Sequence, residues 1–389
     1  MTKNFQCARR LQVLPEYLFD IIAMKKAEAV AKGKDVIDLG VGDPDLPSPL
    51  HVVEALKKAV DDPSHHRYSS FKGMQELRET FAAWFFLRYG VDLDPDGEIL
   101  PLIGSKEGIG HIHLALVDPG DKVLVPDPGY PTFQGGTILA GGIPVYYPLL
   151  PGRGFMPDLQ SIEKMDLRGV KIMHINFPSN PTTAVADLDF FRQMVKFGRR
   201  HGIIVCHDAA YAELFFDEPC PSFLQARGAM EVGVEFHSLS KTYNMTGWRL
   251  GFAAGNRDIV KALGKVKANY DTGVFSAVQR AGIAALSGDQ GCVQRSREIF
   301  RKRRDIFIEG LASMGLEAVE PRATFYVWSP VPGGYTSMEF AEKILEKTAV
   351  VVTPGSGFGE YGEGYFRTAL TVPESRLQEA IDRMSHSNI

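Results

Sequence analysis

Short apolar runs alternate with longer amphipathic segments along most of the chain, which is the pattern of strands and helices taken in turn. The apolar runs that predict strands are 36–39, 122–126, 143–147, 171–175, 203–207, 234–238 and 249–255. The segments that predict helices are 16–32, 74–90, 131–141, 187–201 and 257–267, and helical character dominates 275–315. This alternation predicts an α/β domain built on a mostly parallel sheet.

The pattern shortens after about residue 318. Expected strands at 325–329, 349–353 and 366–370 surround a helix near 338–347, and a last helix lies near 375–384. These elements predict a smaller α+β unit behind the large domain. We find no internal repeat and no low-complexity segment.

Length and composition fit this two-part organisation. The chain has 389 residues, which at roughly 100–200 residues per domain indicates two domains, or one large domain and a smaller one. The 44% of hydrophobic and 23% of charged residues are ordinary for a folded globular protein. A formal net charge of -4 gives no electrostatic reason to expect nucleic acid or an anionic membrane as a partner.

Two further features bear on where the protein works. Residues 128–152 carry no Asp, Glu, Lys or Arg, but repeated prolines and glycines argue against a membrane helix there. The four cysteines are scattered without a CxxC pair, so we expect neither a disulfide framework nor a zinc or other metal site. The first ten residues lack the apolar stretch of a signal peptide, and we expect a cytoplasmic protein.

The segment with the most candidate chemistry is 238–251, which follows an apolar strand. Lys241 lies between small polar residues and near the hydroxyls of Ser238 and Ser240, with Arg249 shortly after. Lysine forms Schiff bases with carbonyl compounds, and hydroxyls with an arginine can bind a phosphate. A cofactor with an aldehyde and a phosphate would need this set. The alternative is a surface loop with one solvated lysine.

Two more segments follow expected strands, where parallel sheets bind ligands. Asp208 could hold a protonated ring nitrogen, and Tyr211 three residues later could reach a ring hydroxyl. Asp208 could equally be a helix N-cap. In the segment 176–182, two prolines would present the Asn180 amide, unless the segment is a plain proline-rich turn.

Weaker signals come from two short motifs. The segment 104–108 begins an expected helix, where Ser105 and free backbone N–H groups could bind phosphate, or where Ser105 is simply an N-cap. Tyr130 is held between prolines in 126–131, where it could stack on a flat ring or belong to the core.

Taken together and in this order, the five segments resemble those of the fold-type I, class I and II aminotransferases that depend on pyridoxal phosphate. The segment SLSKTYNMTGWRLG at 238–251 is especially similar to the lysine signature of that family, and the resemblance covers nearly the whole chain. It implies an α/β fold with a large domain around a mainly parallel seven-stranded sheet and a smaller α+β domain. The implied boundaries are 1–45 for an N-terminal segment with part of the small domain, 46–288 for the large domain and 289–389 for the small domain.

The resemblance also implies a role for each matching residue. Lys241 would bind the cofactor covalently and then shuttle a proton, and Asp208 would pair with the ring nitrogen. Tyr211 and Asn180 would contact the ring oxygen, and Tyr130 would stack on the ring.

The cofactor phosphate would be held by Ser105, the backbone N–H of Lys106, Ser238 and Arg249. Tyr68 matches a tyrosine that reaches the phosphate from a neighbouring subunit, which implies a homodimer with shared sites.

The substrate is the least constrained part of the resemblance. Arg367 matches the arginine that binds the substrate α-carboxylate, although taken alone it could be a surface residue on a strand; Gly42 matches a nearby backbone contact. Lys106 could face the distal end of a substrate, and Tyr17 matches a substrate-contacting tyrosine. The flanking sequences are most similar to the LL-diaminopimelate aminotransferases, and family habit makes 2-oxoglutarate the expected acceptor.

One departure leaves other amino acids open. Thr272 stands where plant-type members of that group have an asparagine, so aspartate and alanine remain alternative substrates. A carbon–sulfur lyase on the same fold is a second alternative. An aminotransferase-like domain of a transcription regulator is disfavoured, because no basic DNA-binding module is visible.

Overall fold

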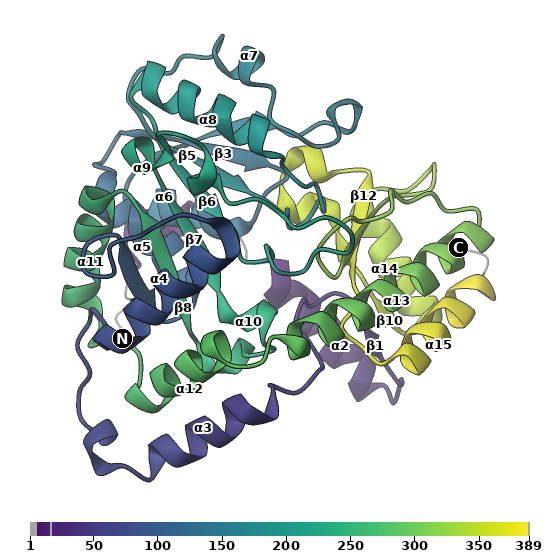
Figure 1. Ribbon diagram of the computed structural model, residues 1–389. Coiled ribbons are helices and arrows are strands. Elements are labelled where there is room, and N and C mark those ends of the chain that lie inside the picture. Colours follow the sequence, from purple (N-terminus) through teal and green to yellow (C-terminus); the bar gives the residue numbers. More distant parts are fainter. Residues whose placement is uncertain (1–5, 16–17, 388–389) are drawn as a thin grey trace, which may run out of the picture.

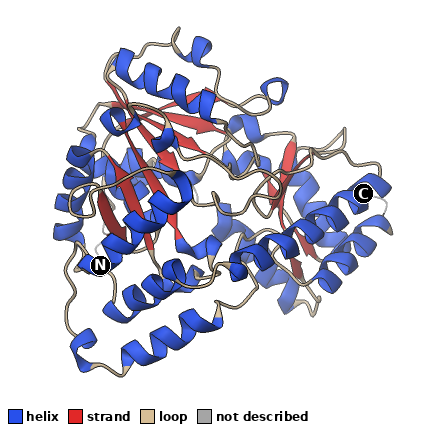
Figure 2. Cartoon of the chain, viewed as in Figure 1, coloured by secondary structure: helices blue, strands red, loops and turns tan. Residues whose placement is uncertain are grey.

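The computed structural model describes residues 6–15 and 18–387. A large sheet with helices on both faces occupies one side of the molecule, and a smaller unit with its own sheets occupies the other (Figures 1 and 2). The large sheet has seven strands in the order β2-β8-β7-β6-β5-β3-β4. Its strands are β2 (Ile99–Leu102), β3 (Lys122–Asp127), β4 (Ile143–Pro148), β5 (Val170–Asn176), β6 (Ile204–Asp208), β7 (Gly233–Ser238) and β8 (Gly251–Gly255).

The pairing is mainly parallel, as predicted from the sequence. The neighbours from β7 to β4 all run parallel, whereas β8 is antiparallel to both β2 and β7. The predicted strand 249–255 begins two residues late, because Arg249 adopts a left-handed φ of 59° that does not continue a strand. The short β2 was not predicted; it contains Pro101, which an edge strand tolerates.

Helices cover both faces of the large sheet. The core residues of α4, α8 and α12 pack on one face, and those of α5, α6 and α11 pack on the other. This double cover explains why β5 and β6 place apolar side chains on both faces of the sheet, as Ile172 and Met173 do in β5. The helices of this part are α3 (Leu50–Val60), α4 (Gln75–Tyr89), α5 (Ser105–Leu116), α6 (Pro131–Leu139), α7 (Leu159–Ile162), α8 (Leu188–His201), α9 (Ala229–Val232), α10 (Leu239–Thr242), α11 (Arg257–Tyr270) and α12 (Ser276–Ser287).

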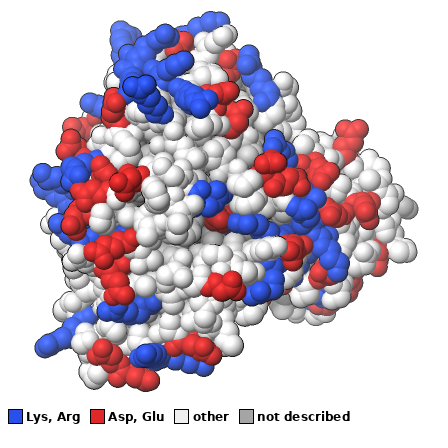
Figure 3. All heavy atoms as spheres, viewed as in Figure 1, with Lys and Arg blue, Asp and Glu red and all other residues white. Residues whose placement is uncertain are grey.

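Local chemistry sets the ends of these helices. At the start of α8, the Asp187 side chain accepts a hydrogen bond of 2.7 Å from the Phe190 N–H. The helix ends at Gly202, whose φ of 64° is the left-handed conformation that glycine adopts without strain. Basic side chains of α8 contribute to the concentration of positive charge at the top of Figure 3, and three of them pair with carboxylates.

The smaller unit combines both ends of the sequence. β11 (Thr353–Pro354), β12 (Tyr365–Ala369) and β9 (Tyr326–Pro330) form an antiparallel sheet in that order, and β1 (Ile37–Asp38) pairs in parallel with β10 (Val350–Val351). The helices here are α2 (Leu18–Ala31), α13 (Gly291–Ser313), α14 (Ser337–Thr348) and α15 (Glu374–Ser385), and α1 (Arg9–Gln12) precedes them. Short 3-10 turns complete the chain at η1 (Pro63–His66), η2 (Pro151–Arg153), η3 (Phe223–Gln225), η4 (Thr246–Trp248), η5 (Gly355–Phe358) and η6 (Glu360–Gly362). The domain boundaries at 45 and 288 stay a prediction.

Among the described residues, none of the helices combines the length and the apolar character that a membrane crossing requires. The uncharged segment 128–152 instead folds as α6, β4 and the turn η2.

Candidate active site

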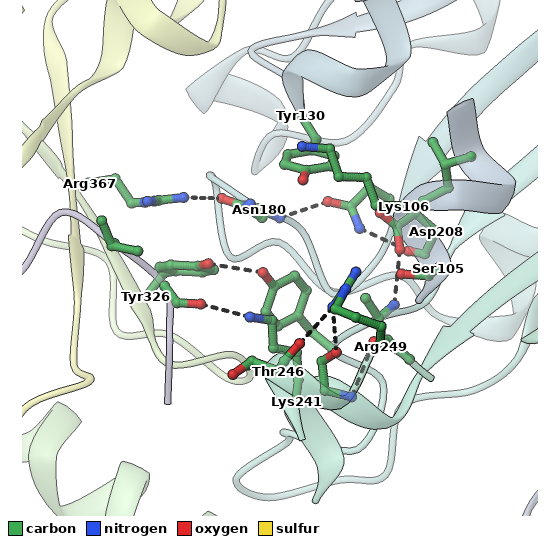
Figure 4. A pocket seen from close by; sticks show the side chains of 18 residues that line it. Ser105, Lys106, Tyr130, Asn180, Asp208, Lys241, Thr246, Arg249, Tyr326 and Arg367 are labelled. Atoms are coloured by element: carbon green, nitrogen blue, oxygen red, sulfur yellow. Dashed lines mark hydrogen bonds between the residues drawn. The ribbon is translucent and has the colours of Figure 1, made fainter. Parts of the chain in front are cut away.

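A cavity of about 340 Å³ lies at the carboxyl ends of β5, β6 and β7, where the large sheet faces the smaller unit. All but two of the site residues predicted from the sequence line it, and Figure 4 shows their side chains entering from different sides. The predicted residues in its lining are Gly42, Ser105, Lys106, Tyr130, Asn180, Asp208, Tyr211, Ser238, Ser240, Lys241, Arg249 and Arg367.

Lys241 lies on α10, the single helical turn that follows β7. The Ser238 hydroxyl caps this turn by accepting a 3.2 Å hydrogen bond from the Ser240 N–H. The Lys241 ammonium donates to the Gly42 carbonyl at 2.7 Å. Burial, together with the positive charges of Arg249 and Arg367, lowers the pKa of Lys241 to about 8. About a tenth of this amine is therefore neutral, and nucleophilic, at pH 7.

Asp208 is the last residue of β6 and is 5% exposed. Burial raises the pKa of this carboxyl to about 6, although the Ala210 N–H donates to it at 3.1 Å and His207 and His237 lower it. The residues after Asp208 form a turn and not a helix, so the helix-cap alternative is wrong. Its carboxylate faces the cavity and can pair with a cationic ring nitrogen.

Arg367 on β12 is 1% exposed, which rules out the surface alternative. Its two terminal nitrogens donate to Asn180 Oδ1 and to the Gly40 carbonyl, both at 2.6 Å. Asn180 is held in turn through its N–H, which donates to Asn176 Oδ1 at 2.8 Å. The Asn176 side chain also donates to the Asp208 carbonyl at 2.8 Å, so the segment 176–182 is fastened to the end of β6.

Tyr326 on β9 joins this constellation although sequence reasoning missed it. Its hydroxyl lies 2.9 Å from that of Tyr211, and its ring lies 4.2 Å from the Arg367 guanidinium carbon. A Cβ on Gly42 would lie 1.8 Å from the Tyr326 hydroxyl, so only glycine fits there. Asn176 and Thr246 also line the cavity without having been predicted. Tyr326 stands in an apolar strand, and only its hydroxyl distinguishes it from a core residue.

A second group of polar side chains lines the cavity near the N-terminus of α5. Ser105 is the first residue of the twelve-residue helix α5, and the Ser238 and Ser240 hydroxyls lie in the same lining. Arg249 Nη1 donates to the Thr246 carbonyl at 2.7 Å and lies 3.5 Å from the Ser240 hydroxyl. A helix N-terminus, hydroxyls and a guanidinium together form a site suited to a phosphate dianion.

Lys106 and Tyr130 lie at the rim, where the Lys106 ammonium is 5.9 Å from the centre of the Tyr130 ring. Tyr130 directly precedes α6 and packs edge-on against Phe133. The same two residues also line a larger, mostly apolar hollow of about 1020 Å³ between α5, α6 and residues 8–15.

Two predicted residues do not join the cavity. Tyr68 is 90% exposed and is not part of its lining. Tyr17 lies outside the residues that the structure describes.

Known proteins resemble this chain over nearly its whole length. The family model for aminotransferase class I and II matches residues 34–384. The LL-diaminopimelate aminotransferase of Moorella thermoacetica is 55% identical over 380 residues, which cover 97% of each chain. That of Aquifex aeolicus is 50% identical over 383 residues, 98% of this chain and 99% of its own.

Among solved structures, apo-BacF from Bacillus subtilis has a TM-score of 0.96 at 37% identity and covers 99% of both chains. A double mutant of the aspartate aminotransferase of Thermus thermophilus has a TM-score of 0.93 at 29% identity, covering 99% of this chain and 100% of its own.

Proposed function

The chain belongs to the class I and II aminotransferases, and from this premise we propose that it transfers an amino group from LL-diaminopimelate to 2-oxoglutarate. That it is an aminotransferase acting on an amino acid and a 2-oxo acid follows from the family. The proposed donor rests on one observation, the identity of 48–55% over nearly the full length to several LL-diaminopimelate aminotransferases. Solved structures that share the fold are less similar, at 29–37% identity.

We propose pyridoxal phosphate as the cofactor, because the residues present fit each part of it. Arg249 approaches Gly104 so closely that a Cβ there would lie 2.2 Å from the guanidinium, and this close approach brings Arg249 beside the N-terminus of α5. The bound cofactor supplies an electron sink for the substrate Cα. The residues proposed to hold it are Ser105, Lys106, Tyr130, Asn180, Asp208, Tyr211, Ser238, Ser240, Lys241 and Arg249.

Lys241 is the proposed proton carrier. Its Nζ is the basic atom of the site with a lowered pKa, and its short helical turn after β7 fixes the position of its Cα. A neutral Nζ can take the proton from the substrate Cα and return it during transfer. The hydrogen bond from Nζ to the Gly42 carbonyl shows that the side chain reaches across to the smaller unit, where substrate would bind.

Asp208 and Arg367 are the charged residues proposed to orient the cofactor and the substrate, respectively. An ionised Asp208 favours a proton on the ring nitrogen. The guanidinium of Arg367 offers a fork that matches a carboxylate, and the Asn180 and Gly40 oxygens hold this fork in place.

Lys106 is proposed to recognise the distal end of the substrate. LL-diaminopimelate and 2-oxoglutarate both carry a second carboxylate, and the ammonium of Lys106 lies at the rim beside Tyr130. Tyr17 and the region of Thr272 remain proposed contributors to this end.

We further propose a homodimer in which Tyr68 completes the site of the neighbouring subunit. Its 90% exposure, together with the apolar hollow beside the site, supports this arrangement. The four cysteines are unpaired, which supports a reducing cytoplasm.

The deciding experiment is a half-reaction. The enzyme loaded with cofactor is mixed separately with LL-diaminopimelate, aspartate, alanine, glutamate and an aromatic amino acid, without an acceptor, and the absorbance of the cofactor is followed. We expect LL-diaminopimelate and glutamate to react fastest. Faster reaction of aspartate or alanine, with LL-diaminopimelate inert, contradicts the proposed donor.

A matched variant isolates the role of the distal carboxylate. Lys106→Met keeps the length of the side chain and removes the charge, so it should raise KM for LL-diaminopimelate and 2-oxoglutarate but leave KM for alanine nearly unchanged. An equal effect on all three substrates contradicts the assignment of Lys106. Release of pyruvate and ammonia from cystathionine at a comparable rate would favour the lyase alternative.

A further inference from the structure

A carboxylate and two imidazoles lie buried together on the face of the large sheet opposite Asp208. Glu235 and His207 are 0% exposed, and His237 is 4% exposed. His207 and Glu235 are paired in register across β6 and β7, and His237 follows two residues later on the same face. Asp208 is the next residue after His207 on β6, so its side chain points to the cavity on the other face.

Four donors converge on the Glu235 carboxylate. Oε2 lies 2.8 Å from His207 Nδ1 and accepts from the Phe223 N–H at 2.7 Å. Oε1 lies 2.5 Å from His237 Nε2 and accepts from the Ser222 hydroxyl at 2.8 Å.

An ionised carboxylate is the form that accepts from four donors at once. Burial by itself would raise the pKa of Glu235, but His237 and His207 lower it below its ordinary value. Glu235 is therefore a buried negative charge.

Both ring nitrogens of His207 face groups that accept. Nδ1 faces the Glu235 carboxylate, and Nε2 lies 3.0 Å from the carbonyl oxygen of Phe177. A neutral imidazole has only one N–H, so it could make only one of these two hydrogen bonds. Making both requires the imidazolium form.

We propose that His207 is a positioning residue, a buried imidazolium held by Glu235, whose charge behind β6 keeps Asp208 ionised for the cofactor ring nitrogen. The charge of His207 does not depend on the proposed function. Only the pairing of Asp208 with the cofactor ring nitrogen rests on the proposed function.

A nearby positive charge matters for Asp208 because burial by itself favours the neutral, protonated carboxyl group. Burial raises the pKa of Asp208 to about 6, and the Ala210 N–H and the charges of His207 and His237 act against that rise. The same imidazole fixes the Phe177 carbonyl, beside Asn176, whose amide binds the Asp208 carbonyl. His207 thus acts on Asp208 through its charge and through the position of the loop.

The other groups around the cluster are mostly aromatic. Phe191 of α8 and Phe223 of η3 pack against the His207 ring, and Phe85 of α4 packs against His237. The other titratable groups near the cluster are Asp208, on the opposite face of β6, and Tyr89 at the end of α4, whose pKa burial raises well above its ordinary value. Neither Tyr89 nor the aromatic rings supply a competing charge at neutral pH.

A second pair of buried histidines gives an internal reference. His113 and His174 face each other with their Nε2 atoms 2.9 Å apart, so at least one of these nitrogens carries no proton. Burial lowers the pKa of His113 to about 4 and that of His174 well below its ordinary value. We therefore expect a charged and a neutral type of buried histidine in one protein.

The charge of His207 is tested by nuclear magnetic resonance on ligand-free protein with 15N-labelled histidine. The His207 signals are identified by their loss in His207→Gln, and those of the reference pair by their loss in His174→Gln. We expect both ring nitrogens of His207 to carry protons at neutral pH, and only one per ring in the reference pair. A single proton on the His207 ring at neutral pH overturns the proposal.

The effect on Asp208 is tested by titrating its carboxyl carbon in 13C-labelled ligand-free protein, with Asp208→Asn to identify the signal. His207→Gln should raise the Asp208 midpoint by about one to two pH units, because it removes a positive charge and leaves Glu235 in place. Glu235→Gln should raise the midpoint by less, because a negative charge is lost together with the positive charge of His207. A lower midpoint in Glu235→Gln would show that His207 stays charged without Glu235 and would overturn the proposed role of Glu235. His174→Gln removes an equally buried ring and should leave the midpoint unchanged.

These outcomes separate this inference from the proposed function. An unchanged Asp208 midpoint in a folded His207→Gln variant overturns the role of His207, whatever the half-reaction shows. If His207→Gln fails to fold, Glu235→Gln and the wild-type nitrogen signals still decide. If LL-diaminopimelate does not react in the half-reaction but both His207 ring nitrogens carry protons, the proposed donor is wrong and the charge of His207 still stands.

Discussion

At the scale of single residues, Lys241 lines the cavity, and its amine lies near the positive charges of Arg249 and Arg367. Burial, Arg249 and Arg367 all favour loss of its proton, and only Asp43 opposes them. Because its pKa is lowered from 10.5 to about 8, the folded protein releases this proton before the unfolded chain does. Stability linked to Lys241 should therefore increase as pH rises from about 8 toward 10.5.

The rate at which ligand-free enzyme captures pyridoxal phosphate should depend on this pKa. The neutral amine is the nucleophile, so the rate should rise with pH and level off above about 8. Stopped-flow absorbance measures this rate, and Lys241→Arg, which keeps the charge, should show no covalent capture. A pH–rate curve with its midpoint near 10.5 would show that the Lys241 amine has its ordinary pKa and contradict the lowered value.

Tyr326 is the clearest case of a site residue whose removal should have a small, specific effect. Tyr326→Phe deletes the hydroxyl that bonds Tyr211 and keeps the ring beside Arg367. A net hydrogen-bond contribution of about 0.5–1.5 kcal/mol corresponds to a fall of about two- to thirteenfold in kcat/KM.

Tyr326→Leu is the comparison variant, because it also removes the ring beside Arg367 and should raise KM further. Steady-state kinetics with one amino donor measures both. Equal kinetics for the two variants would show that the ring contributes nothing.

Much of the site was predictable from the sequence because it lies directly after strands. Asp208 and Lys241 each follow an apolar run, and the carboxyl ends of parallel strands meet at one edge. Tyr326 was not predicted because it lies inside an apolar strand of the smaller unit. Its position beside Arg367 depends on the register between β9 and β12. Tyr68 lies apart from the cavity within one chain, so its role stays a prediction.

At the scale of elements, a clasp joins β3 of the large sheet to η6 of the smaller unit. The Asp127 carboxylate accepts from the N–H groups of Glu360 and Tyr361, both at 3.0 Å. The Gly129 N–H donates to the Phe358 carbonyl at 2.8 Å, and a Cβ on Gly359 would lie 2.0 Å from the Asp127 carboxylate. This clasp lies next to Tyr130 at the rim of the cavity.

Asp127→Ala should loosen this clasp. The substitution leaves two N–H groups without their acceptor, which costs about 1–3 kcal/mol for each one that stays buried. Denaturant unfolding should show this loss, and KM for the amino donor should rise. Asp127→Asn retains one oxygen acceptor and should lose less of both; an alanine variant with unchanged stability and KM would contradict the clasp.

Most elements were predicted from the sequence, and the exceptions have physical reasons. The strands β3, β5, β6 and β7 are mostly buried between helices and rich in apolar residues, so their pattern is strong. The edge strand β2 has only four residues and a proline. The helix α3 was also missed, although Val52 and Ala59 give it the buried face of an amphipathic helix.

At the scale of the whole molecule, the proposed homodimer predicts that two inactive variants can complement each other. A mixed dimer of Lys241→Ala and Tyr68→Ala subunits has one site with both defects and one with neither. Random reassociation makes half of the dimers mixed, so about a quarter of the wild-type activity should return. Each variant alone, mixed with itself by the same unfolding and refolding protocol, is the control, and no recovery would contradict shared sites.

The pairing of β1 with β10 has a consequence for how the chain is made. Ile37 lies opposite Val350, so the partner of an early strand is synthesised roughly 300 residues later. At about 5–20 residues per second, this delay is about 15–60 s, during which the ribosome presents β1 without its neighbour. The large sheet can assemble in that interval, whereas the smaller unit must wait for the end of translation, and chaperones that bind apolar segments would meet the early part of the chain first.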